Sequence, residues 1–257
     1  MLSFLEFIIA FVAAVGVPGL LGVAVLSALG ARKSRALAAF AFGILLFYFS
    51  DTFADSSYLG LNEGIGGAAT WVPLITLMAV GLIGFSAAGS ILAGSGDSLN
   101  VFPATLVAAL AMSVHGIGEG SAVAGVASST DKTVLLEAFG GLGSAAAFVL
   151  HKFLEGAVVG IVYVNTLRLE DRVRWRQVLL IAGVFIIPGI VGTGAGYFAN
   201  FDSTFSFALA LGASVFVFVT LARSLAGDAL TLKNSVTMAA SLFVGFLFMF
   251  ISGLLHS

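Results

Sequence analysis

The sequence has no cysteine and very little charge. Only 9% of its 257 residues are Asp, Glu, Lys or Arg, whereas about 25% is usual for a soluble globular domain. The absence of cysteine excludes disulfides, thiolate metal ligands and cysteine nucleophiles. The chain also lacks any run of basic residues and any mixture of basic and aromatic residues, so nucleic acid is not an expected partner.

Hydrophobic residues make up 60% of the chain, and apolar runs of about 20 residues recur along its whole length. The runs show no strand-like alternation, which indicates helices rather than a barrel. We therefore expect an all-α polytopic membrane protein with a single transmembrane domain over residues 1–257. Because the first charge is Glu6, the first run is expected to be a retained helix, bent near Pro18, rather than a cleaved signal peptide. Eight spans are predicted, roughly at 4–29, 36–57, 72–94, 104–127, 134–166, 177–199, 204–222 and 235–255.

Lysine and arginine collect on one face if the chain crosses the membrane eight times. Nine of the 11 basic residues lie in the loops after the first, fifth and seventh spans: Arg32, Lys33, Arg35, Arg168, Arg172, Arg174, Arg176, Arg223 and Lys233. Only Lys132 falls on the opposite face, and Lys152 lies within a span. Since basic loops favour the cytoplasmic side, both termini are predicted to lie outside.

Two histidine–glutamate pairs lie inside consecutive spans, as HGIGEG at 115–120 and HKFLEG at 151–156. Residues four apart on a helix share a face, so His115 and Glu119 should point the same way, as should His151 and Glu155. The two spans run antiparallel, which would set His115 level with Glu155 and Glu119 level with His151. Two nitrogens and two carboxylates in an apolar setting predict a divalent metal site, suited to Zn²⁺, Fe²⁺ or Mn²⁺.

Three more charged residues bear on this site. Lys152 is far from either end of its span, so we expect its ammonium to pair with the ligand carboxylates rather than reach a membrane surface. Asp51 and Asp55 repeat the four-residue spacing near the outer end of the second span. They are predicted to be either an entrance for the ion or a solvated helix end. GxxxG patterns at 156–160 and 192–196 predict close helix packing.

The residues alone leave other interpretations open. The first is an intramembrane zinc hydrolase whose ligands activate water, although the HExxH motif is absent. The second is a haem-binding electron carrier with His115 and His151 as axial ligands, although a carboxylate lies one turn from each histidine. The third is a membrane scaffold whose polar residues are satisfied by one another.

The two motifs resemble the signature sequences on the fourth and fifth transmembrane helices of ZIP (Zrt/Irt-like protein) metal transporters. FGILLFYFSDTFAD at 42–55 is similar to their second helix, and PG at 188–189 to their sixth. The resemblance implies a ZIP-like helical bundle in the plasma membrane that carries Zn²⁺, or Fe²⁺, Mn²⁺ or Cd²⁺, into the cytoplasm. It implies neither a cofactor nor enzymatic activity, and it implies a homodimer with an elevator-like movement of one helix bundle against another. The implied transport ligands are His115, Glu119, His151 and Glu155, with Asp51 and more weakly Asp55 at the entrance.

Several positions depart from the family pattern. Gly116, Lys152 and Ile187 stand where members can hold ligands for a second, adjacent metal, with Ile187 placed by alignment on Pro188. The loop between the third and fourth spans, GSGDSLN, is short and has no histidine. We therefore expect a mononuclear site in which the Lys152 ammonium replaces the second cation. Two carboxylates and one ammonium would leave the empty site with a charge of −1 and the loaded site with +1.

Overall fold

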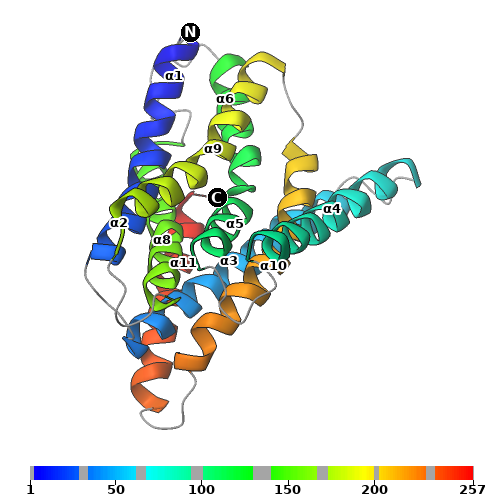
Figure 1. Cartoon of the computed structure of the whole chain (residues 1–257). Helices are drawn as coiled ribbons and strands as arrows, with labels where there is room; N and C mark the ends of the chain where they lie inside the picture. The colour runs from blue at the N-terminus through cyan, green and yellow to red at the C-terminus, as the bar shows by residue number, and fades with distance from the viewer. Residues whose placement is uncertain are drawn as a thin grey trace.

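The computed structural model of the chain describes residues 3–28, 34–61, 68–93, 101–129, 140–166, 173–199, 203–229 and 235–256. Within these ranges the structure is helical and contains no strand, as predicted (Figure 1). The helices are α1 (Phe4–Phe11), η1 (Val12–Gly16), α2 (Val17–Ala28), α3 (Arg35–Leu61), α4 (Ala68–Ala93), α5 (Val101–Ser113), α6 (Gly116–Ser129), α8 (Leu142–Thr166), α9 (Trp175–Ala199), α10 (Ser203–Ala229) and α11 (Ser235–His256). The GSGDSLN loop and most of the predicted basic loops lie outside the described residues.

Seven of the described helical segments are long and apolar enough to cross a bilayer, which makes the chain a multi-pass membrane protein. They are Phe4–Ala28, Arg35–Phe53, Val72–Leu92, Phe102–Gly125, Leu142–Asn165, Trp175–Ala199 and Val236–Leu255. The predicted span 204–222 coincides with a shorter apolar stretch of α10, Ser206–Ala222. The count of eight spans and the outside position of both termini stay predictions.

The first span is irregular one turn before the expected bend at Pro18. Residues 12–16 form a π-helical turn, in which the Val17 amide donates to the Val12 carbonyl five residues back. Proline has no amide hydrogen and its ring clashes with the carbonyl four residues earlier. The widened turn ends two residues before Pro18, and its residues Val15 and Gly16 are buried.

Spans four and five are not the continuous helices that were expected. Span four is interrupted at Val114 and His115, so that it consists of α5 and α6 joined by a two-residue turn. In span five, α8 begins at Leu142, directly after Gly140 and Gly141, whose φ angles of 80° and 104° interrupt a right-handed helix. The predicted beginning of this span, at 134–139, lies outside the described residues. Glu137, at the predicted start of span five, lies outside the described residues.

Glycines bring the helices around the site into backbone contact. A Cβ on Gly156 of α8 would collide with the Gly19 carbonyl of α2, and a Cβ on Gly192 of α9 would collide with the Ile117 carbonyl of α6. The predicted close packing of both GxxxG segments is thereby confirmed. Backbone contacts of the same kind join α3 to α11 and α4 to α10 through Gly43, Gly245, Gly81 and Gly212.

The glycine contacts join these helices in pairs, and the wider packing between helices is densest within two groups. The first group contains α1, α2, α5, α6, α8 and α9, and the second contains α3, α4, α10 and α11, with α8 also packed against α3 and α11 and α5 against α4 and α10. Phe102–Gly125 and Leu142–Asn165, which carry the two motifs, are the most enclosed segments, with 67% and 72% of their apolar windows buried. By contrast, α4 projects from the side of the bundle (Figure 1), and only 6% of its window is buried.

Candidate metal centre

The candidate site lies where the turn between α5 and α6 faces the first half of α8. His115 is the second residue of the turn, and Glu119 is in the first turn of α6. The amide of Gly118 donates to the His115 carbonyl at 2.9 Å, and that of Glu119 donates to the same carbonyl at 3.2 Å. Glycine is a poor helix former, and the GIGEG sequence places three glycines after His115. The interruption presents the histidine and the glutamate on one side of the broken helix.

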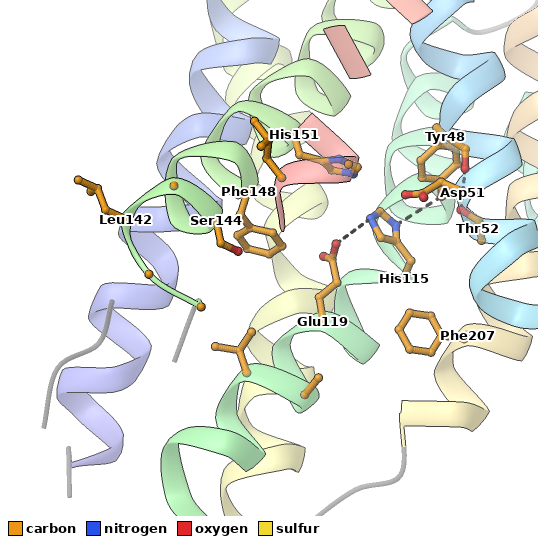
Figure 2. A pocket seen from close by; sticks show the side chains of 17 residues that line it. Tyr48, Asp51, Thr52, His115, Glu119, Leu142, Ser144, Phe148, His151 and Phe207 are labelled. Atoms are coloured by element: carbon orange, nitrogen blue, oxygen red, sulfur yellow. Dashed lines mark hydrogen bonds and ion pairs between the residues drawn. The ribbon is translucent and has the colours of Figure 1, made fainter. Parts of the chain in front are cut away.

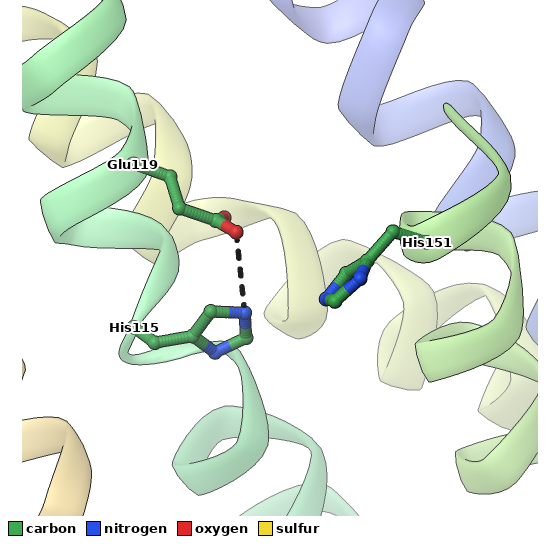
Figure 3. A group of neighbouring side chains, drawn as sticks. All are labelled: His115, Glu119 and His151. Atoms are coloured by element: carbon green, nitrogen blue, oxygen red, sulfur yellow. Dashed lines mark ion pairs between the residues drawn. The ribbon is translucent and has the colours of Figure 1, made fainter. Parts of the chain in front are cut away.

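The four predicted ligands converge. Nε2 of His115 and Nε2 of His151 each lie 2.9 Å from Oε1 of Glu155. Nε2 of His115 is also 3.6 Å from Oε1 of Glu119, and ligand atoms of His115, Glu119 and His151 all lie within 4.8 Å of one another (Figure 3). Four ligands around a zinc ion, each about 2.0–2.1 Å away, stand about 3.3 Å apart. The contacts of 2.9 and 3.6 Å lie on either side of that value, so this group of side chains could hold a metal ion.

Lys152 occupies the other side of the same carboxylates. Its Nζ lies 2.6 Å from Oε2 of Glu119 and 3.0 Å from Oε2 of Glu155, so the expected ion pairs are present. Each carboxylate therefore turns Oε1 toward the histidines and Oε2 toward the ammonium. The Nζ also lies 2.8 Å from Nε2 of His115. The lysine thus contacts three of the four predicted ligands.

Two groups that the sequence did not single out orient His115. Nδ1 of its imidazole lies 2.6 Å from the Met112 carbonyl oxygen, which can only accept, so Nδ1 carries the proton and donates. The hydroxyl of Tyr48 donates to the same carbonyl at 2.8 Å and lies 3.4 Å from Nδ1 (Figure 2). A proton held at Nδ1 directs Nε2 toward the site. A tyrosine within an apolar span was the available signal, because a buried hydroxyl needs a partner.

A cavity of about 740 Å³ reaches the site from one end of the bundle. Its lining includes His115, Glu119, His151 and Asp51 (Figure 2), together with residues 140–144 at the start of α8 and Gly253 and Leu255 at the end of α11. These are the opposite helix ends from those near the basic residues Arg35 and Arg174.

Exposure falls with depth below this cavity. The exposed side-chain fraction is 15% for Glu119, 9% for His115, 3% for His151 and 0% for Glu155. An ion arriving through the cavity would therefore meet Glu119 and His115 before Glu155. Asp51 is half-buried in the cavity wall, and its role as an entrance for the ion stays a prediction. The side chains of Asp55 and His256 lie outside the described residues.

A second, much smaller cavity of about 10 Å³ lies on the lysine side of the carboxylates. It is lined by Lys152, Glu119, Glu155, Gly116 and Ser113, and by Val15, Phe185, Ile186 and Gly189. Its size is about that of one water molecule. The prediction that Ile187 stands at this position is wrong. Ile187 is 53% exposed and Ile186 lines the cavity, because a shift of one residue turns a helical side chain by about 100°.

Comparison with known proteins does not assign this chain to a family. No known family profile matches the chain, and no curated protein matches it. The resemblance to ZIP transporters therefore rests on the motifs and their spacing, and the function is argued below from the site itself.

Proposed function

We propose that this chain carries a divalent transition-metal ion, with Zn²⁺ as the first candidate, across the membrane toward the cytoplasm. The observation that carries the proposal is the convergence of His115, Glu119, His151 and Glu155 at the inner end of a cavity, inside two of the most buried apolar helices. Ionisable groups at such depth in a membrane protein are costly and usually belong to an ion or substrate pathway.

The arrangement supports a carrier better than an open channel. The cavity of about 740 Å³ reaches the ligands from the end of the bundle where α8 begins, and beyond Glu155 the α8 side chains Val158, Val159, Ile161 and Val162 are buried in the apolar core. The four ligands belong to the first of the two groups of packed helices, whereas Asp51 and Tyr48 lie on α3 in the second. Movement of one group against the other would open the site to the opposite face. An elevator-like rearrangement, the plasma membrane as the location and a homodimeric assembly are parts of this proposal.

We further propose that one metal ion binds per chain. The position beside the carboxylates that a second cation would need is taken by the Lys152 ammonium, 2.6 Å from Glu119 and 3.0 Å from Glu155. The ammonium also lies 2.8 Å from Nε2 of His115, so a metal bound at the histidines would displace that one contact. Counting bound zinc in purified protein tests this part, and two ions per chain at these residues would contradict it.

A haem between the two histidines fits this geometry poorly. Both Nε2 atoms lie 2.9 Å from one oxygen of Glu155, and Lys152 lies 2.8 Å from His115. A porphyrin plane between the imidazoles would have to displace both charged side chains into an apolar core. An optical spectrum of the purified protein tests this alternative, and hydrolysis of a lipid or peptide substrate tests the zinc-hydrolase alternative.

The decisive experiment is metal uptake into proteoliposomes, compared across Zn²⁺, Fe²⁺, Mn²⁺ and Cd²⁺. The control is Glu155→Ala, which removes the carboxylate oxygen that contacts both histidines. We expect saturable uptake by the unmodified chain and loss of it in the control. Uptake no greater than that of the control for all four metals would reject the proposal.

A further inference from the structure

The site keeps a cation of its own whether or not a metal is bound. Glu119 and Glu155 bring two negative charges into the membrane interior, and Lys152 brings one positive charge with a side chain only 3% exposed. Without the ammonium the empty site would hold two carboxylates with no permanent counter-charge. Unpaired charges in a low-dielectric setting are strongly disfavoured, and a carrier must move its empty site back across the membrane after each delivery.

Lys152 is placed to make that return with the carboxylates. It lies on α8 between His151 and Glu155, and it contacts Glu119 across the pair of helices that carries all four ligands. The ammonium therefore lies in the same group of packed helices as the ligands. Any rearrangement that carries the ligands from one face to the other carries the ammonium as well.

Metal and ammonium compete at one atom only. Nδ1 of His115 donates to the Met112 carbonyl, so Nε2 of the neutral imidazole has a single lone pair to offer. Nε2 lies 2.8 Å from Lys152 Nζ and 2.9 Å from Oε1 of Glu155. A metal that takes Nε2 must release the contact with Nζ. The two contacts of Lys152 with the Oε2 atoms do not use the oxygens that face the histidines, so they can remain. The lysine gives up one of three contacts and stays in place.

We propose that Lys152 is a tethered counter-cation that lets the metal-free site return, so that this chain performs net uptake rather than obligatory metal-for-metal exchange. The proposal rests on the proposed function as a metal carrier and adds its mode of turnover. The empty site then crosses with a charge of −1 instead of −2. Removing the ammonium should slow the return of the empty site and spare the crossing of the loaded one.

The test measures radiolabelled Zn²⁺ uptake into proteoliposomes held at zero membrane potential, with the lumen either free of metal or filled with unlabelled Zn²⁺. Uptake into a metal-free lumen measures net uptake, and uptake into a lumen filled with unlabelled Zn²⁺ measures exchange. In the unmodified chain these two rates should agree within about threefold. In Lys152→Met and Lys152→Gln, net uptake should fall at least about tenfold and exchange should change less than about threefold. Lys152→Arg should keep net uptake, because it keeps the charge. Lys233→Met, in a predicted loop, is the matched control and should match the unmodified chain.

The outcomes separate this inference from the function on which it rests. If the unmodified chain shows neither net uptake nor exchange, the proposed function as a metal carrier is rejected. Exchange more than about tenfold faster than net uptake in the unmodified chain overturns the role of Lys152, and this comparison needs no variant. Unchanged net uptake in Lys152→Met also overturns it, as does loss of both modes in a variant that remains monodisperse and binds Zn²⁺.

Discussion

The ion pair between Lys152 and Glu155 should have a large coupling energy in a double-mutant cycle. The two atoms are 3.0 Å apart, and the carboxylate side chain is 0% exposed, so water screens the pair little. Coulomb's law at that distance with an effective dielectric constant of about 20 gives about 5.5 kcal/mol. Glu119 shares the ammonium at 2.6 Å, which lowers the part specific to Glu155. We therefore expect a coupling energy of about 2–5 kcal/mol.

The assay is reversible unfolding by SDS in mixed micelles, with a chelator present, for the unmodified chain, Lys152→Met, Glu155→Gln and the double variant. Each single variant leaves a buried charge with fewer partners and should be destabilised, and the double variant should lose much less than the sum of the two. The neutral pair of Tyr163 and Gln177, 2.6 Å apart, serves as a matched control with an expected coupling of about 1 kcal/mol. A coupling at Lys152 and Glu155 no larger than the control would refute the charge arrangement on which the mononuclear site depends.

Three further results are expected. Tyr48→Phe should weaken zinc affinity about 10–100-fold in competitive titrations, because it removes a hydroxyl that helps fix the orientation of His115. The control variant Tyr163→Phe should leave zinc affinity unchanged, and equal affinities for the two variants would contradict the role of the Tyr48 hydroxyl. Gly192→Ala should lower the melting temperature markedly, because the added Cβ would meet the backbone carbonyl of Ile117. Gly194→Ala should not lower it, because the space around a Cβ at Gly194 is open, and similar melting temperatures for both variants would argue against the close helix contact. Asp51→Asn should raise the KM of uptake with little change in kcat, because Asp51 lies in the cavity wall and not among the converging ligands; a fall in kcat alone would place it at the transport step instead.

Much of the ligand set could be predicted because its geometry depends on local rules. A four-residue spacing puts histidine and glutamate on one face of a helix, and consecutive spans must run antiparallel. Those two facts bring His115 to Glu155, as the structure shows at 2.9 Å. The pairing of Lys152 with the carboxylates could also be predicted, because an unpaired ammonium deep in an apolar helix is energetically unfavourable and requires a negative partner.

Other features could not be read from spacing. The position of Ile187 was wrong because alignment on a single proline leaves the rotation of the helix undetermined, and the structure turns Ile186 inward instead. The break at Val114 and His115 was missed because glycine is common in membrane helices and tolerated there. Tyr48 was missed because its acceptor, the carbonyl of Met112, is 64 residues away in the sequence.

The sequence by itself determined that the chain is a helical membrane protein with two histidine–glutamate pairs at its centre, since hydropathy and helical periodicity are properties of neighbouring residues. Only the tertiary structure decided how the charges divide within that centre. It turned one oxygen of each carboxylate toward the histidines and the other toward Lys152, and it opened the cavity to Glu119 while enclosing Glu155. These features depend on the rotation and separation of helices that are distant in sequence, which are set by packing contacts such as those of Gly156 and Gly192.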